Sequence, residues 1–453
     1  MMRVLEFIVA LIIVAVVGVV VGVIMPGSGH VERTLVVGKD MRQVYDVLNN
    51  FRRFPDFSVQ RQYDRNTKYE FSGKAYGPGA EMSWSSDDDK VGNGKLVIAS
   101  NDPSFDKVDV QARTAKIVWN VDNSWRGKDK HFTLDLERQG SRNQLTKITW
   151  SYDVEYGFNL IDRYSNLYIH GDPDAFVQFS LNNLQNVLAQ VPNIDYGKLI
   201  PYVEQTQPTP VLLVSTSIER KGGLDALNDA VDKATSEIQA AAKKLNVNIT
   251  GPRILFTTNY GDQTYNFDVA LPISASSLNV GGQSHDLVAP KPPQLSDSAA
   301  PASSGTAAAP ADANAAPGST DRFGRLIVDS NVRGMLAFGG PALKGEWNGT
   351  FAGVPQTRDM LKAYSQTHGY KFDDVTNPSY DILAKPEVKN GDDVTSYARF
   401  DVYLPISNAP EQTPEQEAGI KPPTLDDAPA SSGTAAAPAS SAPAPAGTAA
   451  PAQ

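Results

Sequence analysis

Two aspartates occupy matching positions in a repeated segment of this chain. Residues 267–273 read Phe-Asp-Val-Ala-Leu-Pro-Ile, and residues 400–406 read Phe-Asp-Val-Tyr-Leu-Pro-Ile, so Asp268 and Asp401 each follow a phenylalanine in an apolar run. A carboxylate buried among apolar side chains needs a cationic partner or hydrogen-bond donors, because an isolated buried charge is costly. Two interpretations are open. Either these carboxylates contact a ligand, or they face solvent from alternating strands.

The other residue types that commonly carry chemistry form no recognisable site. The chain has no cysteine, which excludes disulfides, thiolate nucleophiles and cysteine-ligated metals. Its five histidines are scattered, so no zinc site is expected, and Asp87-Asp88-Asp89 lacks the ligand spacing of a calcium loop. No nucleophile elbow, phosphate-binding loop or dinucleotide fingerprint occurs where a strand leads into a helix. We therefore assign no catalytic residue, metal or cofactor.

Composition limits the classes of protein that remain. The chain has 453 residues, enough for about three domains, and 41% of them are hydrophobic. With 51 acidic and 41 basic residues, the net charge is -10, and no basic stripe is present. Nucleic-acid binding is not expected, because it depends on cationic contacts with phosphates.

A membrane anchor is expected at the N-terminus, within residues 1–29. Residues 7–25 are 19 consecutive uncharged, mostly apolar residues, which as a helix would span roughly the 30 Å hydrocarbon core. A cleaved signal peptide is the alternative, but its apolar region is usually about 7–15 residues long, and no small-x-small cleavage motif follows. Basic residues flank both sides. We expect the N-terminus inside, which places the soluble part in the periplasm of a bacterial inner membrane.

The first soluble region has the pattern of a curved sheet around a long helix. A strand is expected at residues 30–37, followed by a helix that Asp40 opens and Pro55 ends. From residue 58 to 156 apolar residues alternate, which predicts an antiparallel meander. A closing helix at residues 172–191 carries one apolar stripe, so space is expected between helix and sheet.

Three segments in this region carry a family resemblance. Residues 44–55 read Val-Tyr-Asp-Val-Leu-Asn-Asn-Phe-Arg-Arg-Phe-Pro, residues 77–80 read Gly-Pro-Gly-Ala, and residues 91–94 read Val-Gly-Asn-Gly. In order and spacing they resemble the START-like helix-grip superfamily (SRPBCC; polyketide cyclase/dehydrase and lipid-transport-like proteins) over residues 30–200. The resemblance implies a cavity for a hydrophobic ligand, and only some members are enzymes. Four aromatic residues could line it or simply fill a core: Trp84, Trp119, Trp150 and Tyr152.

The second soluble region is a duplication, over residues 205–278 and 322–408. Each copy is expected to fold as strand–helix–strand–strand. In the first copy the strands are expected at residues 211–215, 254–258 and 265–271, with a helix at 224–245. In the second copy, extended segments are expected at residues 325–328, 334–338, 380–384 and 398–404, with a helix at 357–367.

This duplication resembles the gyrase-inhibitor-like, transcription-activator effector-binding family, with the Asp-Val-x-Leu-Pro-Ile strand as its most specific element. The resemblance implies a ligand, often cationic and aromatic, at the junction of the halves against aromatic walls and an acidic group. The acid would be Asp268 or Asp401, and the candidate walls are Tyr265, Trp347, Tyr380 and Tyr403. No basic helix-turn-helix segment precedes residue 208, so a DNA-binding regulator is not expected.

Two segments rich in Ala, Pro, Ser and Thr are expected to be disordered. They are a linker at residues 279–321 and a tail at residues 409–453. Such compositions bury too little apolar surface to offset the entropy of ordering.

Together these features predict an α+β protein that binds, senses or transports a hydrophobic or cationic amphipathic molecule at a bilayer without catalysis. Two alternatives are open: a cyclase- or hydrolase-like enzyme acting on a hydrophobic substrate in the START-like cavity, and a structural envelope protein. An acid–base residue facing a cavity would favour the enzyme.

Overall fold

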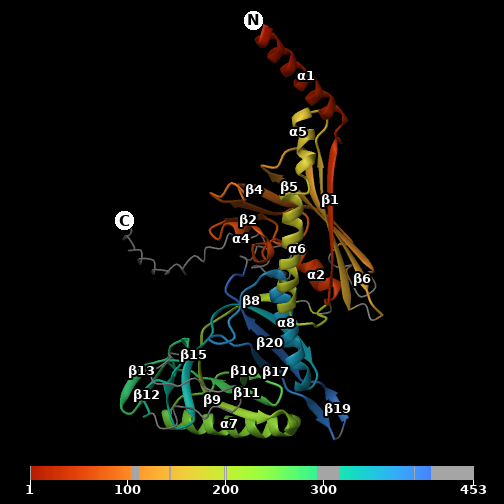
Figure 1. The fold of residues 1–453 in the computed structure, drawn as a ribbon. Coiled ribbons are helices and arrows are strands. Elements are labelled where there is room, and N and C mark those ends of the chain that lie inside the picture. Colours follow the sequence, from red (N-terminus) through yellow and green to blue (C-terminus); the bar gives the residue numbers. More distant parts are fainter. Residues whose placement is uncertain are drawn as a thin grey trace, which may run out of the picture.

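A computed structural model describes residues 2–104, 108, 112–141, 144–197, 199, 201–292, 316–391 and 393–409. It is an α+β structure with mostly antiparallel sheets, as the sequence predicts, and one long apolar helix precedes the two folded regions (Figure 1). The predicted disordered tail from residue 410 onward and the central part of the predicted linker, residues 293–315, lie outside the described residues.

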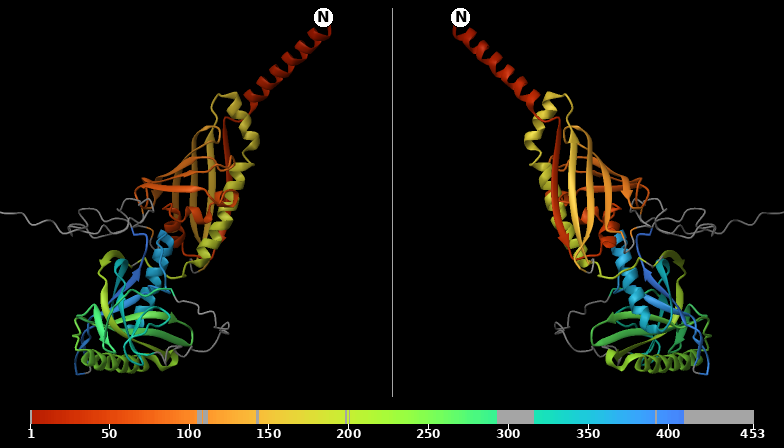
Figure 2. Two further views of the ribbon diagram at one scale, coloured as in Figure 1. Left: turned by 90° about the vertical axis from the view of Figure 1, so that its left-hand side faces the viewer. Right: turned by 90° about the vertical axis from the view of Figure 1, so that its right-hand side faces the viewer.

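Helix α1 (Met2–Ile24) projects away from the rest of the chain (Figure 2). Its side chains from Leu5 onward are almost all exposed. By length and composition it fits a membrane span, and an N-terminal signal sequence would fit the same criteria.

The first domain is a seven-stranded antiparallel sheet in the order β1-β7-β6-β5-β4-β3-β2. The sheet curls into a half-barrel around helix α6 (Asp172–Gln190), and the predicted meander is confirmed (Figures 1 and 2). Buried and more exposed residues alternate along the strands, which gives the curled sheet an apolar inner face. On β5, for example, Ile117, Trp119 and Val121 are buried, and the residues between them are more exposed. The strands are β1 (Ser28–Val37), β2 (Lys68–Gly73), β3 (Ala80–Ser85), β4 (Gly94–Asp102), β5 (Thr114–Asn123), β6 (Lys128–Gln139) and β7 (Leu145–Glu155).

The helix predicted between Asp40 and Pro55 is broken into α2 (Met41–Leu48) and α3 (Phe54–Phe57), with α4 (Gln60–Tyr63) after them. Asp40 caps α2 by accepting the Arg42 N–H at 2.8 Å. Helix α2 stops because the Asn50 side chain donates to the Asp46 carbonyl at 2.5 Å, the acceptor that the Asn50 N–H would use in a longer helix. Pro55 lies in the first turn of α3, where a missing N–H costs little.

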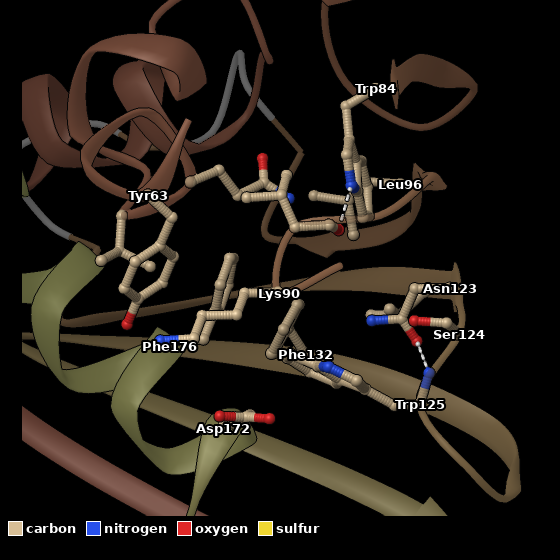
Figure 3. Close-up of a pocket in the computed structure, with 14 residues that line it drawn as sticks. Tyr63, Trp84, Lys90, Leu96, Asn123, Ser124, Trp125, Phe132, Asp172 and Phe176 are labelled. Atoms are coloured by element: carbon tan, nitrogen blue, oxygen red, sulfur yellow. Dashed lines mark hydrogen bonds between the residues drawn. The ribbon is translucent and has the colours of Figure 1, made fainter. Parts of the chain in front are cut away.

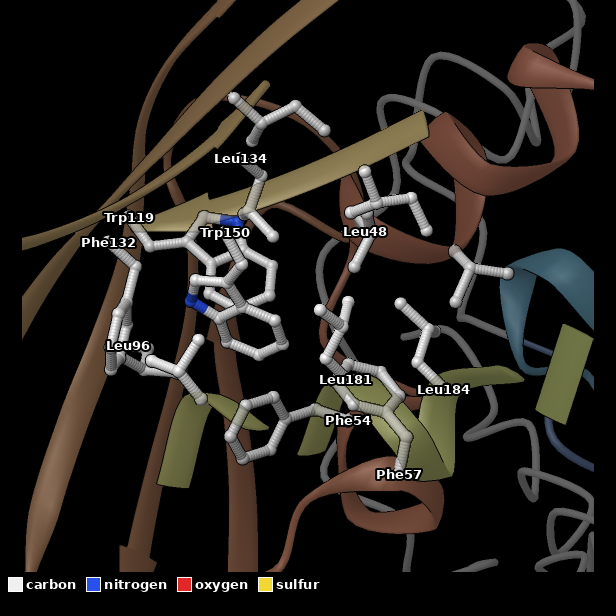
Figure 4. Close-up of a cluster of buried hydrophobic side chains, with 14 of the residues drawn as sticks. Leu48, Phe54, Phe57, Leu96, Trp119, Phe132, Leu134, Trp150, Leu181 and Leu184 are labelled. Carbon is white, nitrogen blue, oxygen red and sulfur yellow. The ribbon is translucent and has the colours of Figure 1, made fainter. Parts of the chain in front are cut away.

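Aromatic side chains fill the core between the sheet and α6 (Figure 4). Trp119 and Trp150 pack edge to face with ring centres 5.5 Å apart, and both are fully buried. Phe54 and Phe57 reach the same core from α3, while Leu181 and Leu184 reach it from α6. Removing one such aromatic ring would cost about 3–5 kcal/mol of stability.

The second domain is one nine-stranded sheet in the order β14-β15-β9-β11-β10-β17-β20-β16-β8. Two units, β9-α7-β10-β11 and β16-α8-β17-β20, meet where β10 pairs with β17. The strand before each unit crosses to the other half: β8 pairs with β16, and β15 pairs with β9. The elements are β8 (Tyr202–Thr206), β9 (Thr209–Glu219), α7 (Gly223–Leu245), β10 (Ile254–Tyr260), β11 (Thr264–Pro272), β14 (Leu326–Ile327), β15 (Val332–Ala337), β16 (Gly340–Asn348), α8 (Val354–His368), β17 (Tyr380–Lys385) and β20 (Arg399–Pro405).

The strand of the second half that corresponds to β9 is β16, which the sequence prediction missed. Residues 342–345 are all buried, so the strand shows no alternation. Gly345 also looks unlike a strand residue, yet it is needed, because a Cβ there would lie 3.2–3.4 Å from Leu199, Thr357 and Leu361 side-chain atoms.

The two ends of the predicted disordered linker are structured, which corrects its boundaries. Strands β12 (Ser277–Val280) and β13 (Gln283–Asp286) form a hairpin. Leu287 is buried, and the Leu336 N–H donates to the Val288 carbonyl at 2.9 Å. Apolar residues at these ends pack on the sheet. The average composition of the whole segment does not reveal them.

The two domains are joined through the loop after α2 and the C-terminal end of α8. The side chains of Asn50, Arg52 and Arg53 donate to the carbonyls of residues 367, 368 and 366, at 3.1, 3.3 and 2.6 Å. The last carbonyls of a helix lack partners within it and carry partial negative charge, so two arginines from the first domain cap a helix of the second.

Candidate functional site

A small aromatic slot opens in the first domain between α4, the sheet and the first turns of α6 (Figure 3). Its volume is about 70 Å³. Trp84, Trp125, Phe132 and Phe176 form apolar walls, and Lys90, Asn123, Ser124 and Asp172 add polar groups. The Trp84 indole is fixed by its Nε1–H, which donates to the Val91 carbonyl at 3.2 Å.

A wider polar groove adjoins the slot and shares Val121, Asn123 and Trp125 with it. The groove is about 750 Å³ and is formed mainly by the turn between β5 and β6. Lys130 holds this turn by donating to the carbonyls of Asn123 and Trp125 at 2.6 and 2.9 Å, and burial lowers its pKa. Gly127 is required there, with φ at 103° and space for no Cβ beside Val154.

The slot and groove lie at the end of the domain that faces α1. Asp162 of helix α5 (Leu160–Tyr164) lines the groove, and Asp172 and Phe176, from the first turns of α6, line the slot. Helix α5 contacts α1 directly, since Arg163 Nη1 donates to the Val23 carbonyl at 2.9 Å. A ligand would therefore enter on the same side as the apolar helix.

The four aromatic residues predicted to line a first-domain cavity are divided between wall and core. Trp84 lines the slot. Trp119, Trp150 and Tyr152 are fully buried behind it, and the two indole Nε1 atoms and the Tyr152 hydroxyl have no hydrogen-bond partner among the described residues. Burial raises the pKa of Tyr152. Three neutral polar groups thus line the core without acceptors, which is uncommon in a closed interior.

The sequence analysis did not identify four residues that line the slot: Lys90, Trp125, Phe132 and Phe176. Trp125 lies in a turn and Phe176 flanks the apolar stripe of α6, so neither stands out by periodicity. Only the pairing of β5 with β6 brings Trp125 and Phe132 together, with ring centres 6.4 Å apart.

Both predicted aspartates of the second domain are buried and already paired. Asp268 accepts from Arg325 Nη1 at 3.0 Å, and Asp401 lies 3.0 Å from Lys344 Nζ and 3.2 Å from Arg399 Nε. Although burial opposes it, contacts with Glu204 and Asp401 raise the pKa of Lys344. Each carboxylate thus has a cationic partner within the chain, although Arg325 is shared with buried Asp321, whose Oδ2 lies 2.6 Å from its Nε.

The six predicted ligand residues of the second domain lie on two faces of its sheet. Asp268, Tyr380 and Tyr403 belong to one cross-strand row through Phe256, and Asp401, two residues before Tyr403, shares that face. The rings of Tyr380 and Tyr403 stack with centres 4.9 Å apart. Alternation places Tyr265 and Trp347 on the opposite face, with α7 and α8, so all six residues do not form one pocket.

A buried charged pair, which the sequence did not reveal, lies on the helix-covered face. Arg358 of α8 and Asp381 of β17 are 2% and 1% exposed, with Nη2 and Oδ1 3.7 Å apart. Both Asp381 oxygens and Nε and Nη2 of Arg358 have no hydrogen-bond partner among the described residues. Burial raises the pKa of Asp381 to about 6, although Arg358 and Arg253 oppose the shift.

We expect the double replacement Arg358→Met with Asp381→Leu to stabilise the protein by about 1–4 kcal/mol, because apolar residues often replace a poorly bonded buried pair favourably. Urea unfolding followed by tryptophan fluorescence measures this. Asp381→Leu alone serves as the control and should destabilise, because it leaves the Arg358 charge buried. If the double variant were less stable than the Asp381→Leu variant, the buried pair of Arg358 and Asp381 would not be what lowers the stability of the unmodified protein.

Neither a family model nor a characterised protein sequence matches the chain. Solved structures give partial matches. They include a hypothetical protein from Helicobacter pylori, with 11% identity over 35% of this chain and 86% of that chain and a TM-score of 0.25. An uncharacterized conserved protein from Listeria innocua matches with 13% identity over 46% and 92%, TM-score 0.25. A hydrolase from Listeria innocua matches with 13% identity over 46% and 91%, TM-score 0.24. At these scores the matches carry no argument about function.

Proposed function

We propose that the protein is a membrane-anchored binding protein that takes up an amphipathic molecule without catalysing its conversion. One observation carries the proposal: an aromatic slot continues into a polar groove at the end of the first domain that faces α1. Pockets that combine apolar walls with a few polar groups are typical of ligand sites. The START-like assignment belongs to this proposal, supported by the order of the strands around α6.

Helix α1 is the membrane anchor. Helix α1 crosses the bilayer with its N-terminus inside, and both folded domains lie on the periplasmic side of a bacterial inner membrane. The length and apolar composition of α1 support this membrane span.

The volumes limit how the ligand binds. A slot of about 70 Å³ is well below the roughly 300–1,000 Å³ of most ligand pockets, whereas the groove reaches about 750 Å³. The polar part of the ligand therefore lies in the groove, and only a short apolar part enters the slot. A longer chain enters when Phe176 and the first turns of α6 move away from the sheet, which would expose the indoles of Trp119 and Trp150 behind it.

The charges of the groove select the ligand's head group. Three lysine or arginine residues face three aspartates across it: Arg126, Lys128 and Lys130 with Asp122, Asp129 and Asp162. Their formal charges cancel, so the groove suits a zwitterionic or uncharged polar head group better than a strongly anionic one.

The second domain is, in the same proposal, a duplicated effector-binding domain. The two strand–helix–strand–strand units and their meeting at β10 and β17 support it. Because Asp268 and Asp401 are paired with Arg325 and Lys344, the first-domain slot is the better candidate for the binding site.

Filling the slot tests the proposed function. Val121, buried on β5, lines both slot and groove, and Val121→Phe should weaken binding of a pyrene-labelled, short-chain zwitterionic phospholipid by at least about tenfold, the equivalent of 1.4 kcal/mol. The measurement is fluorescence titration of the full chain in nanodiscs of unlabelled lipid.

Val97→Phe is the matched control, because partly exposed Val97 lies on neighbouring β4 and does not line the slot or the groove. Overpacking can cost about 1–3 kcal/mol of stability, so thermal unfolding of both variants verifies that they remain folded. Equal affinity in folded Val121→Phe and Val97→Phe variants would remove the slot as the binding site.

A further inference from the structure

The segment between β7 and α6 exposes large apolar side chains beside α1. It comprises α5 and the 3₁₀ helix η2 (Ser165–Tyr168). Phe158 is 95% exposed, Tyr168 75%, Ile161 65% and Leu167 59%. Exposed apolar residues are common singly, but four within eleven residues, including two aromatic ones, indicate a surface that contacts something apolar.

The contacts of this segment with α1 define its depth. The Tyr164 hydroxyl donates to the Gly18 carbonyl, and Leu160 and Tyr164 pack against Gly22, where a Cβ would meet them at 3.2–3.3 Å. Gly18 precedes Ile24, the last residue of α1, by six residues, which is about 9 Å along a helix. Helix α5 therefore lies beside the last two turns of α1, and not beyond its end.

Basic and aromatic groups of the segment suit a lipid–water boundary. Arg163 donates to the Gly157 carbonyl at 2.7 Å and to the Val23 carbonyl at 2.9 Å, and its guanidinium lies 5.6 Å from the centre of the Phe158 ring. Arg126, on the neighbouring turn, is largely exposed. Aromatic rings and arginines concentrate where the hydrocarbon meets the head groups.

We propose that residues 157–168 form an interfacial docking element that inserts into the head-group and acyl boundary of the bilayer crossed by α1. The inference rests on the proposed anchoring of α1. A depth of about 9 Å along α1 matches the roughly 5–10 Å to which interfacial helices are buried. A bilayer accounts for the patch better than a protein partner does, because the patch continues the apolar surface of α1 itself. Docking there holds the mouth of the slot at the membrane surface, since Asp162 of α5 lines the groove.

Site-specific labelling tests the docking, and a chain without cysteine allows single-cysteine variants directly. The full chain is reconstituted into phosphatidylcholine–phosphatidylglycerol vesicles with an environment-sensitive fluorophore at Tyr168→Cys. Val14→Cys reports on the span, and Tyr397→Cys, 62% exposed in the second domain, is the water-facing control. Spin-labelled lipids quench only fluorophores within the bilayer. We expect blue-shifted, strongly quenched emission at positions 14 and 168, and unquenched emission at position 397.

Each other outcome overturns the docking in a distinguishable way. Quenching at position 14 but not at 168 would remove the docking and leave the anchor. Quenching at neither position would remove both. Emission at 168 that is blue-shifted without quenching would place this position against protein, in the same chain or in a second copy, instead of lipid. Phe158→Glu in the Tyr168→Cys background is a second variant; its charge should reduce the quenching at 168, and it is not expected to disturb folding because Phe158 is almost fully exposed.

Discussion

Asp46→Ala is expected to destabilise the protein by about 3–5 kcal/mol, because it removes one partner of a buried ion pair and leaves the other charge behind. Asp46 is fully buried. It accepts from Arg42 Nε at 3.0 and 3.1 Å, from the Tyr76 hydroxyl at 2.7 Å and from the Tyr196 hydroxyl at 2.8 Å. Charge-assisted hydrogen bonds of this kind are stronger than neutral ones.

The Asp46 network also connects the two domains. Asp46 and Tyr76 belong to the first domain, whereas Tyr196 lies between α6 and β8, in the segment that leads to the second domain. The Tyr196 hydroxyl is 3.0 Å from the Thr367 hydroxyl of α8. Burial and the nearby Asp46 carboxylate raise the pKa of both tyrosines, so they remain donors at physiological pH. Losing Asp46 should therefore weaken the junction between the two domains as well as the first domain itself.

Urea unfolding of the full chain measures this effect, with Asp56→Ala as the control. Asp56 pairs with Arg53 at 2.8 Å but is exposed, and exposed ion pairs contribute only about 0–1 kcal/mol. Asp46→Asn separates charge from shape, because the amide keeps the volume and loses the charge. Equal unfolding midpoints for Asp46→Ala and Asp56→Ala would show that the buried network does not hold the junction.

Much of the architecture can be predicted from local patterns in the sequence. The first-domain strands alternate, so their inner faces can be read without tertiary information, as Ile148, Trp150 and Tyr152 on β7 show. The repeat around Asp268 and Asp401 likewise reveals two equivalent units. Strand β16 was not predicted because Lys344 and Gly345 lie in an unbroken run of buried residues. Such a run shows no alternation between buried and exposed positions.

The candidate site could not be predicted in the same way, because its groups meet only after folding. The match between Asp268 and Asp401 places both on one sheet face, but the cation that pairs with Asp268, Arg325, lies 57 residues away in sequence. Tyr265 and Tyr380 look equivalent as strand aromatics, yet the register sends them to opposite faces. Arg358 and Asp381 show the same limit, since neither is unusual in sequence.

A second large effect is expected from pH, through His368 at the end of α8. This ring is fully buried and stacks on Tyr364 with centres 3.8 Å apart and on Tyr76 with centres 5.2 Å apart. Burial lowers the pKa of His368 from 6.5 to about 4, and Arg42 and Arg52 act in the same direction, whereas Asp46 and the Tyr364 carbonyl oppose it. Between these two pH values the unfolded chain binds a proton that the folded chain does not.

The sign of the effect follows from that difference. The contribution of His368 to stability is fully present above pH 6.5 and is lost as the pH falls toward 4. The fall of the His368 pKa from 6.5 to about 4 corresponds to about 3 kcal/mol of stability. Asp381 acts in the opposite direction: its folded pKa of about 6 exceeds the ordinary 3.8, so its protonation stabilises the folded chain as the pH falls from 6 to 4. In the unmodified protein, the pH dependence of stability due to His368 opposes the pH dependence due to Asp381. The stability of the unmodified protein alone would therefore reveal neither contribution.

The difference between the unmodified chain and His368→Gln isolates the histidine. Urea unfolding at pH values from 4 to 8 should show this difference falling by about 3 kcal/mol from pH 7 to pH 4, whatever constant cost the lost ring packing adds. Asp381→Asn is the counterpart, since it removes the opposing slope and should steepen the loss of stability at low pH. Because His368 lies within the junction that Asp46 holds, acidification should also loosen the contact between the domains. A difference curve that stays flat would show that the folded state protonates His368 as readily as the unfolded state does, and the ring would then have to be reached by water.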